Sequence, residues 1–338
     1  MSNFCRKLLQ IFSIASFIVC SASSAWAASF TINDGQTVTT TQTLVDGETG
    51  LIESGGFLDL TGSNNTSAVT VSANNVTVTN NGSISTAGSQ DSITIGNQNN
   101  VTVINNGTIS VSGVNGDGVA QNNGSNFVFI NNGTITTSGS TGAIGSSAET
   151  VINKGDNGSI TNNGTLATTG NRGSAVFTEG DGDLVTNNGT ITTSGNNANG
   201  IIVGLNAGTS IGSTITNNSI IRVTGSGSEG ILVVNGSGTT INNSGLISAE
   251  QSATAAIDGS NNADTLNLLS GSQIIGTVDL DGGTDIVNIS GANNSSTLTL
   301  TDVETINIIN GNGLLVGDVV TMVDPTGQSV SSAVLSTT

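Results

Sequence analysis

The chain has 338 residues, of which 23 are acidic and only 5 are basic, with no histidine, 47 glycines and a single proline. So few cations cannot neutralise a run of phosphates, which argues against nucleic acid as a partner and against charge-driven binding to an anionic membrane. Both cysteines, Cys5 and Cys20, lie near the N-terminus, before Ala27. The rest of the chain therefore lacks the ligands of the usual zinc and copper sites.

The N-terminal segment, from Met1 to Ala27, is typical of a secretory signal peptide. Arg6 and Lys7 form a positive start, residues 8–20 are mostly apolar, and Ala25-Trp26-Ala27 resembles a cleavage site. The apolar run is too short for a comfortable membrane span, although an uncleaved anchor is the alternative. We predict a signal peptide over residues 1–27, and hence an exported protein at a bacterial cell surface, in the outer membrane or outside the cell.

A phrase of the form Asn-Asn-Gly-Ser/Thr-Ile/Leu recurs through the middle of the chain. Its copies begin at Asn80, Asn105, Asn131, Asn162 and Asn187, and degraded copies begin at Asn217 and Asn242. The spacing is nearly constant, except that the steps from Asn131 to Asn162 and from Asn187 to Asn217 are longer than the others. A near-fixed period of this size is typical of a solenoid, in which one supersecondary unit stacks on the next.

Residues 101–111 have the alternation expected of two short strands around a corner. Val101, Val103, Ile109 and Val111 alternate with polar residues, and only Ile104 breaks the pattern. Stacking the copies pairs each strand with its equivalent one coil on, in a parallel ladder. We predict an all-β fold, a right-handed parallel β-helix (solenoid) of roughly 25-residue repeats, rather than a meander of hairpins. It should cover residues 28–290, with C-terminal coils and a junction over residues 291–338.

The asparagines of the phrase have a structural explanation. Stacked amides can hydrogen-bond from coil to coil, so we interpret Asn80, Asn105, Asn131, Asn162 and Asn187 as structural corner residues. The two long spacings indicate insertions near Glu149–Gly158 and near Asn206–Gly212. Insertions in a solenoid leave the stack as loops, where partners most often bind, although these two also fit tolerated drift.

Enzyme chemistry finds little support in the residue types. Residues 208–212 match the Gly-x-Ser-x-Gly pattern of serine hydrolases, but no histidine exists to act as the base. Glu179, Asp181 and Asp183 form an acidic cluster that could serve paired-carboxylate glycoside hydrolysis. A sugar cleft normally stacks rings on Trp or Tyr, and after Ala27 the only aromatic residues are Phe30, Phe57, Phe127, Phe129 and Phe177. We therefore expect no catalytic residue and no enzyme activity.

Calcium is the only cofactor that the sequence suggests. Residues 261–268 and 282–289 are single, imperfect copies of a calcium-roll nonapeptide, with Asp264 and Asp285 as the candidate ligands. Such rolls bind calcium between adjacent tandem copies, whereas these two are well separated in the sequence. A terminal coil with an Asp turn is the favoured interpretation.

Taken together, several segments resemble the passenger region of a bacterial autotransporter. They are the leader, the Val-Thr-Val-x-Asn-Asn-Gly-Thr-Ile phrase of residues 101–109, and residues 264–268, 285–289, 303–306 and 319–327. The resemblance implies an outer-membrane β-barrel as the partner that exports the passenger, and no such barrel is present in this chain. It covers essentially the whole sequence and identifies an architecture rather than an activity.

Two classes of function remain. The favoured one is an adhesin or structural stalk that contacts host-cell or bacterial surface molecules and is not an enzyme. The alternative is a polysaccharide-active β-helix, a hydrolase or lyase that uses the acidic cluster at Glu179, Asp181 and Asp183. A minor hypothesis is ice binding through Thr-x-Thr columns such as residues 134–136 and 190–192.

Overall fold

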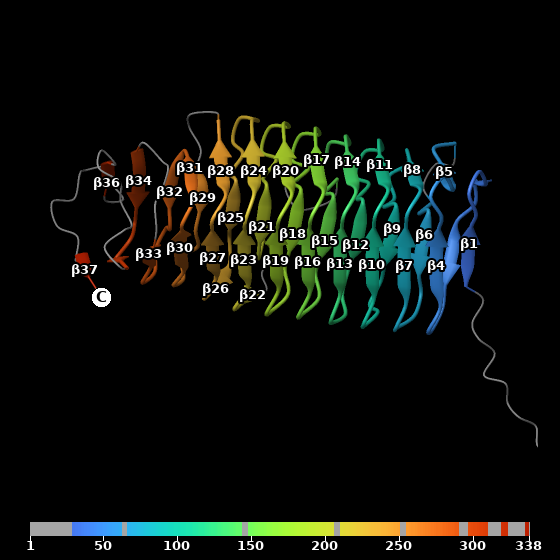
Figure 1. Cartoon of the computed structure of the whole chain (residues 1–338), viewed down its shortest axis with the longest axis horizontal. Helices are drawn as coiled ribbons and strands as arrows, with labels where there is room; N and C mark the ends of the chain where they lie inside the picture. The colour runs from blue at the N-terminus through green and yellow to red at the C-terminus, as the bar shows by residue number, and fades with distance from the viewer. Residues whose placement is uncertain are drawn as a thin grey trace, which may run out of the picture.

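A computed structural model of the protein describes residues 29–62, 66–143, 148–205, 210–250, 255–290, 297–309, 319–323 and 335–337. All regular secondary structure in these residues is β-strand, and the strands stack into one elongated solenoid (Figure 1). The parallel β-helix expected from the repeat is confirmed. No helix in the described ranges is long and apolar enough to cross a membrane. The predicted signal peptide, residues 1–27, lies outside them.

Sheet 1 takes one strand from each coil and has 13 strands in the described part of the chain. With neighbouring strands about 4.8 Å apart, it spans roughly 58 Å. Its strands are β1 (Phe30–Ile32), β4 (Thr49–Ile52), β7 (Thr77–Asn80), β10 (Thr102–Asn105), β13 (Val128–Asn131), β16 (Ser159–Asn162), β19 (Leu184–Asn187), β23 (Thr214–Asn217), β27 (Thr240–Asn243), β30 (Thr265–Leu269), β33 (Ile286–Ser290), β35 (Thr305–Ile308) and β37 (Leu335–Thr337).

Sheet 2 follows the asparagine corner and has 10 strands within the described ranges. They are β2 (Thr37–Val38), β5 (Phe57–Leu60), β8 (Ser83–Thr86), β11 (Thr108–Val111), β14 (Thr134–Thr137), β17 (Thr165–Thr168), β20 (Thr190–Thr193), β24 (Ile220–Val223), β28 (Leu246–Ala249) and β31 (Gln273–Ile275). The described part of the chain adds no strand to this sheet after β31. Where sheet 2 ends, the register step along sheet 1 falls from 25 residues between β27 and β30 to 21 and then 19 residues in the next two steps.

Sheet 3 closes each coil and has 12 strands in the residues described. They are β3 (Gln42–Leu44), β6 (Val69–Val71), β9 (Ile93–Ile95), β12 (Val119–Gln121), β15 (Val151–Asn153), β18 (Val176–Thr178), β21 (Ile201–Val203), β25 (Ile231–Val233), β29 (Ala255–Asp258), β32 (Thr277–Asp279), β34 (Thr297–Thr301) and β36 (Val319–Val323). A small extra sheet pairs β22 (Ser210–Ile211) with β26 (Gly236–Ser237).

The interior of the solenoid is one continuous aliphatic core. Buried side chains from Ile32 to Ile306 form a single cluster that runs along the axis. Period-2 alternation produces it, because Val103 points inward on β10 while its neighbours Thr102 and Ile104 are only half-buried. Ile104, which breaks the apolar pattern, faces outward and pairs in register with the outward Ile130. The sequence alternation is thus an inside–outside pattern with one extra apolar residue outside.

The corner asparagines form a buried column between sheets 1 and 2. The Nδ2 atom of Asn80 lies 2.8 Å from Oδ1 of Asn105, and Asn105 donates in the same way to Asn131. The column continues through Asn162, Asn187, Asn217 and Asn243 to the hydroxyl of Ser272. Each amide also donates to a backbone carbonyl, as Asn162 does to Thr190. Every amide of this column is therefore satisfied within the stack.

The second asparagine of each phrase forms an exposed column that runs in the opposite direction. Asn106 donates to Asn81 on the preceding coil, whereas the buried Asn105 donates to the following one. The same polarity recurs at Asn132, Asn163, Asn188 and Asn218. The two columns therefore connect successive coils by hydrogen bonds on the inner and the outer side of each corner.

Two details of the repeat differ from the sequence prediction. The last corner is Asn243, not Asn242, because Asn217 pairs with Asn243 and donates to it at 2.8 Å. The position predicted for the first insertion is also wrong. β15 aligns directly with β12, so the extra residues lie within 138–150 and not near Glu149–Gly158. The second insertion does lie where it was predicted, between β21 and β23.

Candidate functional site

The proposed calcium ligands Asp264 and Asp285 are buried and bonded to the backbone. Asp264 accepts hydrogen bonds from the Thr239 N–H at 3.2 Å and the Ser260 N–H at 2.9 Å. Asp285 accepts one from the Asp264 N–H at 2.6 Å, and its own N–H donates to Glu304 at 2.7 Å. The carboxylates thus form a ladder in which each one binds an amide of the preceding coil. These hydrogen bonds connect successive coils in the turn before sheet 1, and they leave Oδ2 of Asp285 buried without a hydrogen-bond partner.

The acidic cluster proposed for glycoside hydrolysis divides between the interior and the surface. Asp183 is only 1% exposed and accepts hydrogen bonds from the side chains of Asn153 and Thr178 and from the Gly158 N–H. Burial raises the pKa of Asp183 to about 6. Asp181 is exposed, and its Oδ1 accepts from the Ile211 N–H at 2.8 Å. Asp183 is engaged in holding the turn and is shielded from any sugar.

The Gly-x-Ser-x-Gly phrase is only partly described, since residues 208 and 209 fall outside the described ranges. Ser210 is buried, donates to the Gly180 carbonyl at 2.9 Å and lies the same distance from the Ser213 hydroxyl. A buried hydroxyl with these bonds is positioned to hold the second insertion against the stack. It is not presented as a nucleophile.

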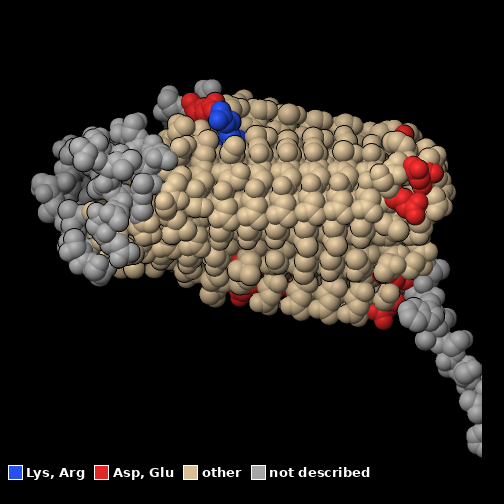
Figure 2. All heavy atoms as spheres, viewed as in Figure 1, with Lys and Arg blue, Asp and Glu red and all other residues tan. Residues whose placement is uncertain are grey.

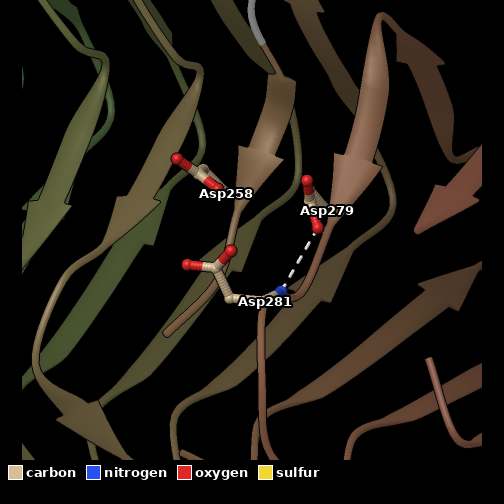
Figure 3. A group of neighbouring side chains, drawn as sticks. All are labelled: Asp258, Asp279 and Asp281. Carbon is tan, nitrogen blue, oxygen red and sulfur yellow. Dashed lines mark hydrogen bonds between the residues drawn. The ribbon is translucent and has the colours of Figure 1, made fainter. Parts of the chain in front are cut away.

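Three other carboxylates converge on the outside of sheet 3. Asp258 at the end of β29, Asp279 at the end of β32 and Asp281 in the following turn each offer an oxygen within 4.8 Å of the other two (Figure 3). Asp258 and Asp279 are register partners, and the Asp281 N–H donates to Asp279 at 3.3 Å. Asp281 has a left-handed φ of 58°, which aspartate tolerates better than most residues do. The sequence repeat does not predict this cluster.

Burial and the crowding of like charges both raise pKa values in this cluster. Burial, followed by repulsion from Asp281 and Asp279, raises the pKa of Asp258 to about 6. Burial and the charge of Asp279 also raise the pKa of Asp281. Three carboxylate oxygens suit calcium, magnesium or manganese, with water completing the shell. The cluster can therefore bind either a proton or a hard cation.

A second set of acids stacks in the turn before sheet 3. The Asp117 N–H donates to Asp91 at 3.2 Å, and the Glu149 N–H donates to Asp117 at 2.8 Å. Farther along the same column, the Asn199 N–H donates to the Ser174 hydroxyl, and the Glu229 N–H donates to the Asn199 side chain. Burial raises the pKa of Glu149 to about 7, and burial with repulsion from Glu149 and Asp91 raises the pKa of Asp117 well above its usual range. The column is structural and sensitive to protonation.

The outer faces are poor in charge. Most of the face seen in Figure 2 carries neither acidic nor basic side chains. The ion pair found in the described residues joins Arg222 to Glu250 at 2.6 Å, and both side chains are exposed. Hydroxyl side chains form a column on the outer face of sheet 2, from Thr108 through Thr134 and Thr165 to Thr190. Sheet 3 instead carries a second buried apolar cluster, separate from the interior core, which contains Ala120, Ile152, Phe177 and Ile202. No family model matches the chain, and neither a curated protein nor a solved structure shows significant similarity to it.

Proposed function

We propose that the protein is an exported, non-enzymatic β-helical passenger that acts at or beyond the bacterial cell surface as an adhesin or structural stalk. The observation that carries the proposal is the unbroken core from Ile32 to Ile306 under continuous parallel sheets. A solenoid of this kind is a stiff spacer whose side faces are long and repetitive. Such faces suit multivalent contact with another surface.

The fate of the polar groups supports the same proposal. The corner asparagines, Asp183, Asp264 and Asp285 all bind neighbouring coils. Side chains that hold a stack together are not available for catalysis at a single site. External contacts would then be made by the outer faces of the sheets, which are poor in charge, and by the two insertions between coils.

Adhesion by the purified chain tests this proposal. Beads coated with residues 28–338 should attach to at least one of host cells, immobilised matrix proteins or other bacteria, and soluble protein should compete for the attachment. Beads coated with urea-unfolded chain of the same composition provide the control. Attachment that survives unfolding would show nonspecific binding through charge or exposed apolar residues. If the beads attach to none of these surfaces, the adhesin role is contradicted and only the role of a spacer remains.

A further inference from the structure

A hollow on the outer face of sheet 2, near its N-terminal end, contains an aromatic side chain, Phe57, at a register position that is aliphatic in Ile220 and Leu246 near the other end of the sheet. It has a volume of ≈ 260 Å³ and is lined by Thr37, Phe57, Leu58, Asp59, Ser83 and Ser85. The lining spans three coils, since Thr37 pairs with Phe57 and Phe57 with Ser83. In the next coils the position of Phe57 is taken by serine or threonine, from Ser83 to Thr190.

The aromatic ring in this hollow is unusually exposed. Phe57 is 46% exposed, whereas Phe127, Phe129 and Phe177 are fully buried. A phenylalanine left half in water forgoes much of the stabilisation that burial of its ring would provide. The pairing partner Ser83 shows that the coil accepts a small polar residue at this position. The ring is therefore dispensable for the strand and available to a ligand.

Asp59 places a carboxylate beside the ring. It lies two positions along β5 on the same face, so its Cα is about 6.7 Å from that of Phe57. Its Oδ1 accepts hydrogen bonds from the Thr61 N–H at 2.9 Å and the Thr61 hydroxyl at 2.7 Å, and these bonds lower the pKa of Asp59. Neither bond uses Oδ2. The hollow thus presents an ionised oxygen together with an aromatic face.

The surrounding charge favours a cation. Residues 29–62 contain five acids, Asp34, Asp46, Glu48, Glu53 and Asp59, and no lysine or arginine. Lys154 is the first basic residue after Lys7, and it lies three coils away in the stack, directly after β15. A surface of one sign raises the local concentration of ions of the other sign. A neutral ligand gains nothing from this field.

We propose that the hollow formed by Phe57 and Asp59 binds an organic cation, the guanidinium or ammonium group of an arginine or lysine on a basic partner protein. The cation lies over the ring within about 6 Å of its centroid and pairs with Asp59. The hydroxyls of Thr37, Ser83 and Ser85 accept its remaining N–H groups. The site rests on the proposed adhesive function and gives it a ligand class.

A fluorescein-labelled tri-arginine peptide is the probe, with binding to the full-length chain followed by anisotropy. Phe57→Ser, which installs the residue of the next coil, and Asp59→Asn should each weaken binding about tenfold. Leu184→Thr removes an equally exposed apolar side chain from sheet 1, and Asp34→Asn removes an exposed charge from the same end. Both controls should stay within about twofold of the parent, and melting curves should show all four variants folded.

Equal weakening by Asp34→Asn and Asp59→Asn would reduce the effect to diffuse charge and overturn the site. A neutral oligosaccharide that binds in a Phe57-dependent but salt-independent manner would assign the hollow to a glycan instead. If the parent binds the peptide but coated beads attach to no surface, the site stands and the adhesive proposal fails. If Phe57→Ser beads attach as well as the parent, adhesion stands and this site is not its contact.

Discussion

Asn131 and Asn162 are separated by a longer stretch of chain than Asn162 and Asn187, yet Nδ2 of Asn131 lies 2.8 Å from Oδ1 of Asn162. The same distance joins Asn162 to Asn187. The insertion between the first pair therefore leaves the stack without disturbing the corner. The buried amide column keeps the coils in register, while the chain between coils is free to vary in length.

Removing one member of the column should destabilise the solenoid. Asn162→Ala deletes the donor to Asn187, Gly164 and Thr190 and removes the side-chain acceptor of the Asn131 amide. We expect a loss of roughly 1–3 kcal/mol in the free energy of unfolding, measured by urea denaturation. Asn163→Ala alters the exposed column at the neighbouring position and should cost less than about 0.5 kcal/mol. Equal losses would refute the special role of the buried column.

The protein should be more stable at pH 5 than at pH 8. The folded-state pKa values of Glu149, Glu229 and Asp285 are raised to about 7, mainly by burial, and those of Asp183 and Asp258 to about 6. The folded chain therefore binds more protons than the unfolded chain between about pH 4 and 7. This contribution is complete below the unfolded pKa values and is lost as pH rises through the folded ones. Because Glu149 alone would account for about 5 °C, the melting temperature should fall by more than about 5 °C from pH 5 to pH 8.

Glu149→Gln isolates one part of this pH dependence. In the parent, burial raises the pKa of Glu149 from 4.5 to about 7, which corresponds to about 3 kcal/mol of stability. The variant should therefore lose less stability than the parent between pH 5 and pH 8. Asp46→Asn changes an exposed acid and is the matched control. A parent chain whose melting temperature is flat or rises toward pH 8 would contradict the assignment.

Asp183 should prove structural. Asp183→Asn places an amide NH₂ where two carboxylate oxygens now accept from Asn153, Thr178 and Gly158. We expect a loss of roughly 1–3 kcal/mol in the free energy of unfolding. Asp181→Asn keeps the Oδ1 acceptor for Ile211 at an exposed position and should change stability little. Any glycan turnover that vanishes in the folded Asp181→Asn variant would revive the polysaccharide-active alternative.

Calcium should not act through Asp264. Asp264→Ala removes the acceptor of the Thr239 and Ser260 amides, so its melting temperature should fall by the same amount in excess calcium and in chelator. Asp258→Ala, in the three-carboxylate cluster, provides the comparison. A calcium-dependent stabilisation that disappears only in Asp264→Ala would restore the calcium-roll interpretation.

The period of the asparagine phrase was enough to predict the coil, its strands and the corner, because each copy places one apolar residue inward beside the turn. The last copy shows the limit of this reasoning. Asn242-Asn243-Ser244 reads like Asn217-Asn218-Ser219, but Ile241 must stack on Ile215. A slip of a single position would turn Ile241 out into solvent, so burial decides the register against the phrase.

The three-carboxylate cluster could not be predicted from the repeat. Asp258 and Asp279 are closer in sequence than one full repeat, because the coils shorten where sheet 2 ends, and β29 carries an irregularity between Ala255 and Ile257. The left-handed turn at Asp281 then brings the third carboxylate back toward the sheet. Local geometry outside the period places these residues together.

Binding and turnover measured in the same samples distinguish an adhesin from an enzyme. Purified chain would be titrated against host cells, matrix proteins and bacterial surface polysaccharides while the release of soluble sugar is monitored in the same samples. The account predicts saturable binding to at least one surface and no catalytic release from any. Sustained release of sugar by the folded chain, with no stable binding to any surface, would contradict it.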